Sequence, residues 1–378
     1  MNMIQEIFRR GFNEFRKKYR TSLLILKVVF AIMNCKTEAL GTRTYTCDDC
    51  GHTMILYNSC GNRHCPSCQS LPREMWMDAR KAEIFEDSQY FHIVMTVPRQ
   101  LNPIFHCNKK LMYGLLHKCS SEAIIELSRS SNGMGGTPAV IQVLHTWGND
   151  LKYHPHLHCI VSGFGLSPSK ELVECKEDFL FPLPMLKRIF RGKFLSYLNE
   201  MYISGSLKLP KELDHLHWLN LMDKLYSIEW CPYIKETFNG NGNAIDYLGR
   251  YTYRVAISNS RIKEVTDTHV TFSAYDYKTG TTKDITLTLV EFIRRYLMHV
   301  LPKGFQKIRY YGLLNNRFKS RNLELLQILR KRKLREAILK GLKMEDKLKY
   351  LWDVDVSICP KCKGNNLKLT SRTFPLKL

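Results

Sequence analysis

The spacing of hydrophobic positions changes along the chain and divides it into regions. Residues 1–20 alternate apolar and charged side chains at helical spacing, and residues 23–35 form a longer apolar stretch interrupted by Lys27. A bilayer-spanning helix needs about 20 apolar residues, so the second stretch predicts a buried helix and no membrane anchor. The first stretch lacks an apolar core followed by a small-residue cleavage site, so we expect no secretion signal.

Strand and helix patterns follow each other from residue 90 onward. Strands are predicted at residues 90–97, 139–146, 156–162, 270–274 and 284–289, and helices at residues 109–129 and 291–300. Gly148, Asn149 and Asp150 are turn formers between the second and third strands, which we therefore expect to pair antiparallel. The fold class predicted is α+β.

Charge is the outlying feature of the composition. The 378 residues include 57 Lys and Arg against 35 Asp and Glu, a formal net charge of +22, which favours a polyanionic partner, nucleic acid before membrane. Residues 301–350 hold fifteen of these cations against four acidic groups. We read this region as helical, with a helix over residues 323–343 whose Arg330, Lys331, Arg332 and Lys333 can follow a phosphate backbone.

The cysteines predict zinc. Cys47-Asp-Asp-Cys50 and Cys65-Pro-Ser-Cys68 are two CxxC turns separated by fourteen residues, the spacing of a zinc ribbon or related finger. Four thiolates leave no open coordination position, so this zinc would be structural. Four neighbours can replace one of these ligands: Cys35, His52, Cys60 and His64. Arginines around the module, including Arg63, favour contact with nucleic acid.

A further pair, Cys359-Pro-Lys-Cys362, lies near the end of the sequence and resembles half a zinc knuckle. No second CxxC follows it. It either takes ligands from elsewhere in the chain or is a turn without metal. Because we expect no secretion signal, we expect the cysteines to lie in a reducing, cytoplasmic compartment, where CxxC pairs indicate metal or redox chemistry more often than disulfides.

Two histidines form a second candidate metal site. His156 and His158 stand at i and i+2 on a predicted strand, so they project from one face while Leu157, Cys159 and Val161 project from the other. His145 on the neighbouring strand is the best third ligand, and the weaker alternatives are Gln142, Asp150 and His154. Imidazoles alone suit zinc, but an incomplete site open to phosphate accepts Mg²⁺ or Mn²⁺.

Tyr247 and Tyr251 are four residues apart. On a helix their hydroxyls emerge from one face, about one turn from each other. Phenols at this spacing can attack a phosphodiester in turn, and Arg250 and Arg254 can stabilise the charge that develops. Aromatic residues at this spacing most often belong to a core, so the pattern indicates catalysis only beside the histidine pair.

These residues closely resemble the two-tyrosine group of HUH-type rolling-circle insertion-sequence transposases, which carry an N-terminal zinc-binding domain. The resemblance extends over nearly the whole chain, through Tyr57-Asn-Ser-Cys-Gly-Asn-Arg-His-Cys-Pro-Ser-Cys68, His154-Pro-His-Leu-His-Cys159, Tyr247-Leu-Gly-Arg-Tyr251, Val255-Ala-Ile-Ser-Asn259, Glu291-Phe-Ile-Arg-Arg295 and Gly304-Phe-Gln-Lys-Ile-Arg309. Tyr253 departs from it, since similar sequences carry a histidine there.

The resemblance implies a nuclease domain with a central antiparallel sheet, the histidine pair on a middle strand and the tyrosines on a facing helix. A histidine-bound divalent ion would polarise the scissile phosphate of single-stranded DNA at an element end. Tyr251 or Tyr247 would attack it, giving a 5′-phosphotyrosine and a free 3′-hydroxyl. No P-loop pattern is present, in agreement with chemistry that needs no nucleotide cofactor.

The expected organisation has three parts: a helical N-terminus with a zinc-binding module (residues 1–80), a catalytic domain (residues 85–310), and a basic helical tail with a possible zinc knuckle (residues 311–378). Two other functions stay open. One is a rolling-circle replication initiator or relaxase, which uses the same metal and tyrosine chemistry. The other is a non-catalytic, zinc-containing DNA-binding regulator.

Overall fold

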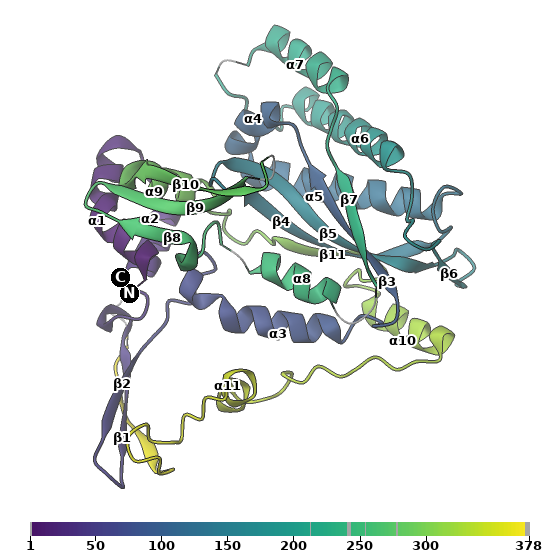
Figure 1. Ribbon diagram of the computed structural model, residues 1–378. Helices are drawn as coiled ribbons and strands as arrows, with labels where there is room; N and C mark the ends of the chain where they lie inside the picture. The colour runs from purple at the N-terminus through teal and green to yellow at the C-terminus, as the bar shows by residue number, and fades with distance from the viewer. Residues whose placement is uncertain (1, 212, 240–242, 254, 277–278, 375–378) are drawn as a thin grey trace.

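A six-stranded antiparallel sheet forms the centre of the molecule (Figure 1). The computed structural model describes residues 2–211, 213–239, 243–253, 255–276 and 279–374. The strands run in the order β11-β4-β5-β3-β7, with β6 paired to β5. Their bounds are β3 Gln89–Thr96, β4 Thr137–Trp147, β5 Tyr153–Leu166, β6 Leu172–Glu174, β7 Tyr233–Asn239 and β11 Ile308–Gly312. The predicted α+β class and the antiparallel pairing of β4 with β5 are confirmed.

One face of this sheet is covered by helices and forms the largest core. The helices are α4 Asn102–Cys107, α5 Lys109–Arg129, α6 Leu183–Ile203 and α7 His215–Ser227. Because side chains alternate along a strand, Leu157, Cys159 and Val161 of β5 all enter this core. The predicted helix over residues 109–129 is confirmed in full.

The opposite face carries α8 (Asn243–Thr252), which contacts β3, β4 and β5, and behind it α3 (Ser70–Lys81). Helices α3 and α8 approach closely at Gly249, where a Cβ atom would lie 2.4 Å from the Met77 sulfur. Helix α10 (Lys319–Arg330) extends this layer. Helix α8 is therefore the element that lies directly on this face of the sheet.

A second unit lies beside the central sheet and joins segments far apart in the sequence (Figure 1). It contains α1 (Met3–Lys18), α2 (Leu23–Met33), a sheet ordered β10-β9-β8, and α9 (Leu289–Met298). The strands are β8 Ile262–Val265, β9 His269–Asp276 and β10 Thr281–Thr288. Helix α1 packs its apolar face on α9. No helix of the described residues is long and apolar enough to cross a membrane.

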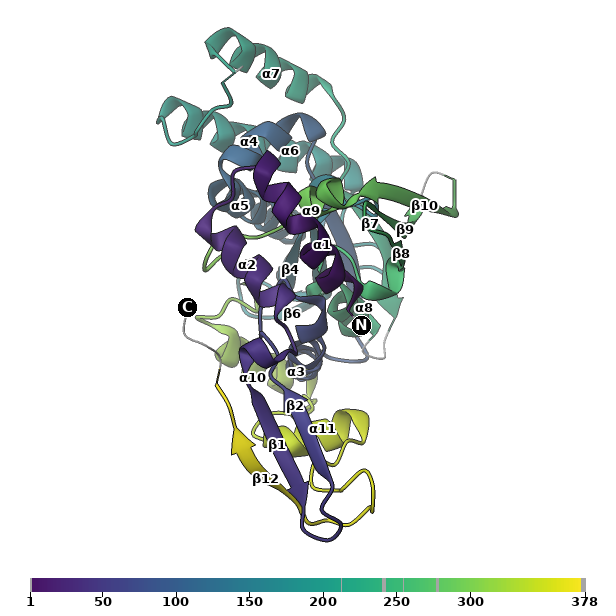
Figure 2. The same ribbon diagram turned by 90° about the vertical axis from the view of Figure 1, so that its left-hand side faces the viewer.

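A third sheet, ordered β12-β1-β2, projects away from the rest of the molecule (Figures 1 and 2). It combines the hairpin β1 (Thr42–Cys47) and β2 (Thr53–Tyr57) with β12 (Leu367–Arg372), which follows helix α11 (Met344–Trp352). Short 3-10 helices lie at Glu38–Leu40, Pro66–Cys68, Arg99–Leu101 and Asn259–Arg261.

The single helix predicted over residues 323–343 is wrong. Helix α10 ends at Arg330, and Lys331 has a left-handed backbone with φ of 51°. Instead of continuing as a helix, the chain runs along α3, where the Asp78 carboxylate accepts hydrogen bonds from the Leu339 and Ile338 amides and from Arg335. Residues 308–312 also differ from the helical reading, since they form edge strand β11 beside β4.

Candidate functional site

Three histidines meet on the sheet face that α8 covers. His145 on β4 lies directly opposite His156 on β5, and Val143 lies opposite His158. All three imidazoles are buried, and one ring nitrogen from each lies within 4.8 Å of the others. The structure therefore brings together the three residues that the sequence proposed.

Neighbours hold the outer ring nitrogens of His156 and His158. His156 donates from Nδ1 to the His154 carbonyl oxygen at 2.7 Å, so its Nε2 is left facing the Nε2 of His158 at 3.2 Å. His158 Nδ1 pairs with His92 Nε2 at 2.9 Å. Burial lowers the pKa of the His156 imidazole to about 3. Neutral imidazoles with convergent nitrogens are the donor set that a divalent cation requires.

The weaker candidates for a third ligand do not belong to the cluster of convergent nitrogens. Gln142 is on the opposite face of β4, where its side chain contacts His117 of α5. Asp150 forms an ion pair with Lys152 in the connection between the strands. The exposed His154 offers its backbone oxygen to His156.

His92 is the site residue that the sequence reasoning missed. It is fully buried on β3, and its ring stacks on that of His158 with centroids 5.1 Å apart. The ring of Tyr247 approaches it from α8, at a centroid distance of 4.9 Å. The signal in the sequence is the alternation in residues 90–97, which puts His92 on the face opposite the apolar Phe91 and Ile93. An isolated histidine gave no reason to look there.

Helix α8 carries the two tyrosines, as the sequence predicted for this segment. Tyr247 is half-buried next to His92, and Asp246 anchors the helix through an ion pair with Lys81 of α3 at 2.5 Å. The backbone of Tyr251 lies one helical turn further along. The side chains of Arg250 and Tyr251, and residue Arg254, lie outside the described residues.

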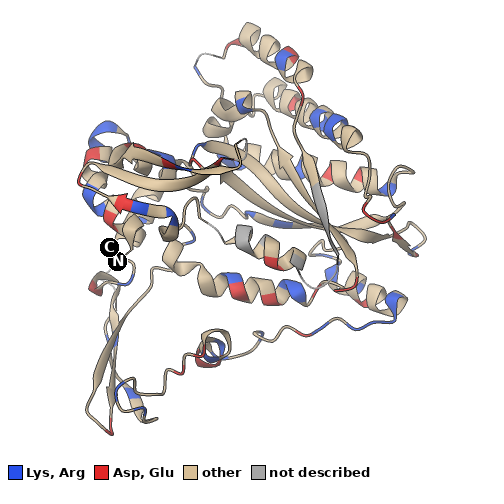
Figure 3. Cartoon of the chain, viewed as in Figure 1, with Lys and Arg blue, Asp and Glu red and all other residues tan. Residues whose placement is uncertain are grey.

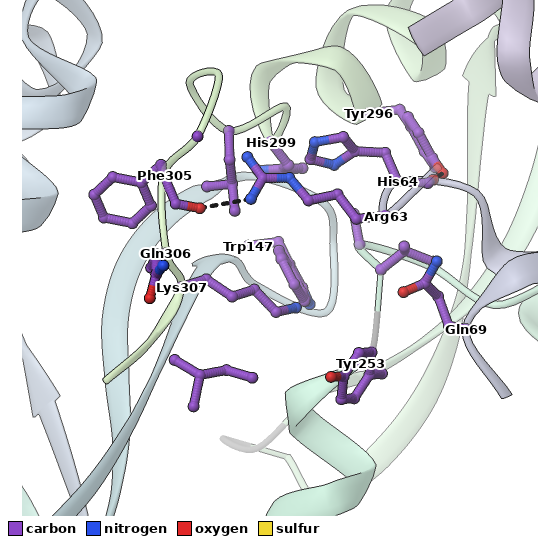
Figure 4. A pocket seen from close by; sticks show the side chains of 15 residues that line it. Arg63, His64, Gln69, Trp147, Tyr253, Tyr296, His299, Phe305, Gln306 and Lys307 are labelled. Carbon is purple, nitrogen blue, oxygen red and sulfur yellow. Dashed lines mark hydrogen bonds between the residues drawn. The ribbon is translucent and has the colours of Figure 1, made fainter. Parts of the chain in front are cut away.

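A pocket of about 370 Å³ adjoins the histidine cluster (Figure 4). Its wall includes Trp147, whose ring stacks on His145 with centroids 4.5 Å apart. Tyr253 and the cationic Arg63 and Lys307 also line it. Burial lowers the pKa of the Lys307 ammonium to about 7, and the charge of Arg63 adds to this effect. Aromatic rings beside cations suit a base with its phosphate.

The cysteines form two clusters, and the expected grouping of the two CxxC turns into one site is wrong. Each cluster takes one of the turns and completes it with other residues, so that sulfur atoms of four cysteines lie within 4.8 Å of one another: Cys35, Cys60, Cys65 and Cys68 in the first, and Cys47, Cys50, Cys359 and Cys362 in the second. The hairpin β1–β2 carries the first CxxC turn away from the second. The C-terminal pair therefore lies beside two cysteines from elsewhere in the chain.

The first cysteine cluster is anchored to the body of the molecule. Gln5 of α1 donates to the Cys35 carbonyl oxygen, and Tyr296 of α9 donates to the His64 carbonyl oxygen at 2.6 Å. Arg63 donates to the carbonyl oxygens of Phe305 and Pro302, at 2.6 and 2.8 Å. These contacts place the cluster next to the pocket.

The basic residues proposed for the C-terminal region have different surroundings. Arg330 has a side chain only 9% exposed, which pairs with Glu174 and lies over the Phe164 ring, 4.3 Å from its centroid. Arg332 pairs with Asp87, whereas Lys331 and Lys333 are exposed. Lys and Arg are frequent along this stretch after α10 (Figure 3).

Comparison with known proteins gives the class. Residues 7–97 match the family model described as a transposase zinc-binding domain, and residues 139–322 match the model described as a putative transposase. The first contains the first cysteine cluster, and the second contains the three histidines and α8. Fold and site together define a transposase with a zinc-binding domain.

Relatives narrow this class to a family. The chain is 42% identical over 327 residues to "Putative transposase y4qJ" of Sinorhizobium fredii, covering 85% of this chain and 82% of that protein. It is 29% identical over 300 residues to the "Transposase for insertion sequence element IS801" of Pseudomonas savastanoi pv. phaseolicola, covering 77% and 70%. The chain belongs to the two-tyrosine, HUH-type family of insertion-sequence transposases with an N-terminal zinc-binding domain. No solved structure matches it significantly.

Proposed function

We propose that this transposase cleaves and rejoins single-stranded DNA at the ends of its element by metal-assisted tyrosine attack, in rolling-circle transposition. One observation carries the proposal: three imidazoles converge on the sheet face that α8 covers, and His92 links them to the ring of Tyr247. This is the arrangement that a metal-dependent phosphoryl transfer to tyrosine needs.

The histidines supply a place for the cation. His145, His156 and His158 would hold Mg²⁺ or Mn²⁺, and a three-nitrogen set leaves positions open for phosphate oxygens. Such an ion polarises the scissile phosphate when bound. His92 and the His154 carbonyl oxygen keep the Nε2 atoms of His158 and His156 facing the site.

The tyrosines supply the nucleophile. The Oη atom of Tyr247 or Tyr251 bonds to phosphorus while the bond from phosphorus to the 3′ oxygen breaks. The 5′-phosphate stays on the tyrosine, and the 3′ oxygen leaves as a hydroxyl with the proton of the phenol. Attack by a 3′-hydroxyl on the phosphotyrosine reverses the step and rejoins DNA without ATP, and the second tyrosine allows a second transfer. Arg250 and Arg254 would stabilise the developing charge.

The pocket beside the cluster suits a nucleotide flanking the scissile phosphate. Trp147 and Tyr253 offer rings for stacking, and Arg63 and Lys307 offer positive charge. Exposed Lys331 and Lys333 would add phosphate contacts, with Arg332 once it exchanges Asp87 for DNA. Arg330 would not contact phosphate, because it forms an ion pair with Glu174 and lies over the Phe164 ring.

The zinc of the N-terminal domain is assigned here to Cys35, Cys60, Cys65 and Cys68. Four thiolates close the coordination sphere, so this ion holds structure and performs no chemistry. Its role is to fix the segment that carries Arg63 against the pocket.

The test is incubation of the full chain with single-stranded oligonucleotides from the ends of its element, plus Mg²⁺ or Mn²⁺. We expect a covalent protein–DNA adduct on a denaturing gel, and peptide mapping should place it on Tyr247 or Tyr251. The double variant Tyr247→Phe/Tyr251→Phe should form no adduct. The matched control is Tyr275→Phe, a change to an exposed side chain on strand β9 that should leave adduct formation intact.

Two outcomes would contradict the proposal. An adduct mapped to Tyr253 would show that Tyr247 and Tyr251 are not the nucleophiles. DNA binding that survives in the double variant, with no adduct formed by the unaltered chain under any metal, would favour a DNA-binding regulator instead.

A further inference from the structure

The second cysteine cluster joins the two ends of the chain. Cys47 ends strand β1 and Cys50 follows it, whereas Cys359 and Cys362 precede strand β12. The Sγ atoms of Cys47 and Cys362 are 3.6 Å apart, and those of Cys50 and Cys359 are 3.7 Å apart. Sulfur atoms around a tetrahedral zinc, with Zn–S bonds of about 2.3 Å, are about 3.8 Å from each other. The cluster has the dimensions of a tetrathiolate zinc site.

The two CxxC turns have the same backbone hydrogen bonds. The Cys47 amide donates to the His52 carbonyl oxygen and the Gly51 amide donates to the Cys47 carbonyl oxygen, both at 2.9 Å. In the second turn the Cys359 amide donates to Gly364 at 2.8 Å and the Lys363 amide to Cys359 at 2.9 Å.

Both turns also contain a left-handed residue directly after the second cysteine. Gly51 has a φ of 66° and Lys363 a φ of 65°. Lysine adopts this conformation only at a cost, so the second turn has a geometry that its own sequence does not favour. Two matching knuckles that face each other are what a shared metal ion would hold in place.

The sheet built on these turns has almost no other core. Its buried residues are Cys47, Cys359 and Leu367, with Tyr45, Cys50 and Met54 packed against them. Half of this small cluster is therefore cysteine. Ile55, Leu56 and Tyr57 of β2 are exposed. A module of this size needs a metal or disulfides to be stable, and all four thiols are free.

We propose that Cys47, Cys50, Cys359 and Cys362 bind a second structural zinc ion, separate from that of the N-terminal zinc-binding domain. Cys359 and Cys362 lie outside both segments that match known family models. The ion ties β12 to the hairpin β1–β2 and so fastens the chain on both sides of the segment 331–358. Asp78 holds the near end of that segment on α3, and the zinc holds the far end.

Metal content tests this proposal in the full chain purified under reducing conditions. In a His156→Ala/His158→Ala background, which removes the histidine cluster as a further zinc site, we expect two zinc ions per chain by elemental analysis. The cysteine variants are compared in the same background. The variant Cys359→Ser/Cys362→Ser should keep one, and so should Cys47→Ser/Cys50→Ser. Because both pairs serve one ion, the quadruple variant should also keep one. The matched control Cys107→Ser/Cys231→Ser changes two exposed cysteines outside the clusters and should keep two.

Cobalt gives a readout of geometry. In a titration of the metal-free chain with Co²⁺, the thiolate charge-transfer absorption of tetrahedral sulfur sites should correspond to two bound ions. The histidine cluster has no sulfur ligand and should add none of this absorption. The Cys359→Ser/Cys362→Ser variant should show it for one bound ion. Limited proteolysis should then cut residues 344–374 of this variant faster than those of the unaltered chain, while the catalytic domain stays resistant.

The zinc count distinguishes the selective loss of one ion from general unfolding. A variant that has unfolded loses both ions, whereas a folded variant that lacks only the second site loses one. The proposal is overturned if the unaltered chain holds a single zinc, if Cys359→Ser/Cys362→Ser leaves the count unchanged, or if mass spectrometry finds these four cysteines in disulfides.

Discussion

At the scale of single residues, His92 makes the most direct prediction about the metal site. His92→Leu removes the partner of His158 Nδ1 while keeping most of the side-chain volume at this buried position. Loss of such a supporting hydrogen bond lowers metal affinity by about 10–100-fold. Calorimetric titration with Mn²⁺ should show this increase in Kd.

The control for His92→Leu is His117→Leu. His117 is equally buried, but it contacts Gln142 on the opposite face of the sheet. The His117→Leu substitution should lower the stability of the chain and leave the Kd for Mn²⁺ unchanged. Equal effects of the two variants on that Kd would mean that His92 only fills space.

Lys307 makes a prediction about pH. Burial lowers its pKa to about 7, and a bound phosphate favours the ammonium form and raises that pKa in the complex. Affinity for an oligonucleotide should therefore be constant below pH 7 and fall as the pH rises above it, by at most about tenfold per pH unit. Fluorescence anisotropy between pH 6 and 9 measures this. Lys307→Arg keeps its charge and should flatten the profile; identical profiles would rule out phosphate contact by Lys307.

The lowered pKa of Lys307 should make stability rise with pH, whereas the affinity for DNA should fall. The unfolded state keeps the lysine protonated up to its ordinary pKa of 10.5, so between pH 7 and that value the unfolded chain binds more protons than the folded one. The contribution of Lys307 to the free energy of unfolding therefore rises with pH across this window.

Local spacing explains which site residues could be predicted. The i, i+2 pattern indicated the common face of His156 and His158, and the turn formers after Trp147 brought His145 opposite His156. His92 needed the register between β3 and β5, which no local pattern encodes. The cysteine grouping failed for the same reason, because Cys359 is 309 residues from Cys50 and no spacing rule reaches that far.

At the scale of elements, the position of α8 depends on its contact with α3. A side chain at Gly249 would meet the Met77 sulfur and Cγ atoms at 2.4 and 2.6 Å. Gly249→Leu should therefore cost about 1–3 kcal/mol of unfolding free energy and reduce adduct formation, since it shifts the helix that carries the tyrosines. Adding Met77→Ala should restore part of both quantities. Urea denaturation and the adduct assay measure them.

Gly192 in α6 provides the matched helical control. Nothing lies within 4 Å of a Cβ at that position, so Gly192→Leu should not destabilise the chain, because leucine favours a helix over glycine. A lack of rescue by Met77→Ala would show that Gly249 matters for another reason than this contact.

Elements with a clear period of hydrophobic positions could be predicted from the sequence. Elements whose structure depends on contacts with distant residues could not. Helix α5 begins and ends where its sequence indicates. Residues 331–343 are rich in cations and helix formers, yet hydrogen bonds to Asp78, more than 250 residues away, hold them along α3. Strand β11 is five residues long and depends on pairing with β4. In both, tertiary contacts override local propensity.

At the scale of the whole molecule, the expected three consecutive parts do not describe how the chain packs. Helix α1 lies on α9, and Arg10 of α1 pairs with Asp267 after β8. Strand β12 completes a sheet begun by β1. Segments near both ends of the sequence thus pack against distant parts of the chain, and sequence order alone could not reveal these contacts.

The basic segment after α10 makes the last prediction, because its cations fall into two kinds. Lys331 and Lys333 are exposed, so they are available to phosphates, whereas Arg330 is held by Glu174 and Phe164. The logarithm of affinity for single-stranded DNA falls with the logarithm of salt by about 0.7 for each phosphate neutralised. Lys331→Gln/Lys333→Gln should therefore reduce this slope by about 1.4 with no change in Tm. Arg330→Gln should lower Tm and leave the slope as it is. Anisotropy titrations from 50 to 300 mM salt and thermal melts distinguish the two, and an unchanged slope in the double lysine variant would remove this segment from the DNA path.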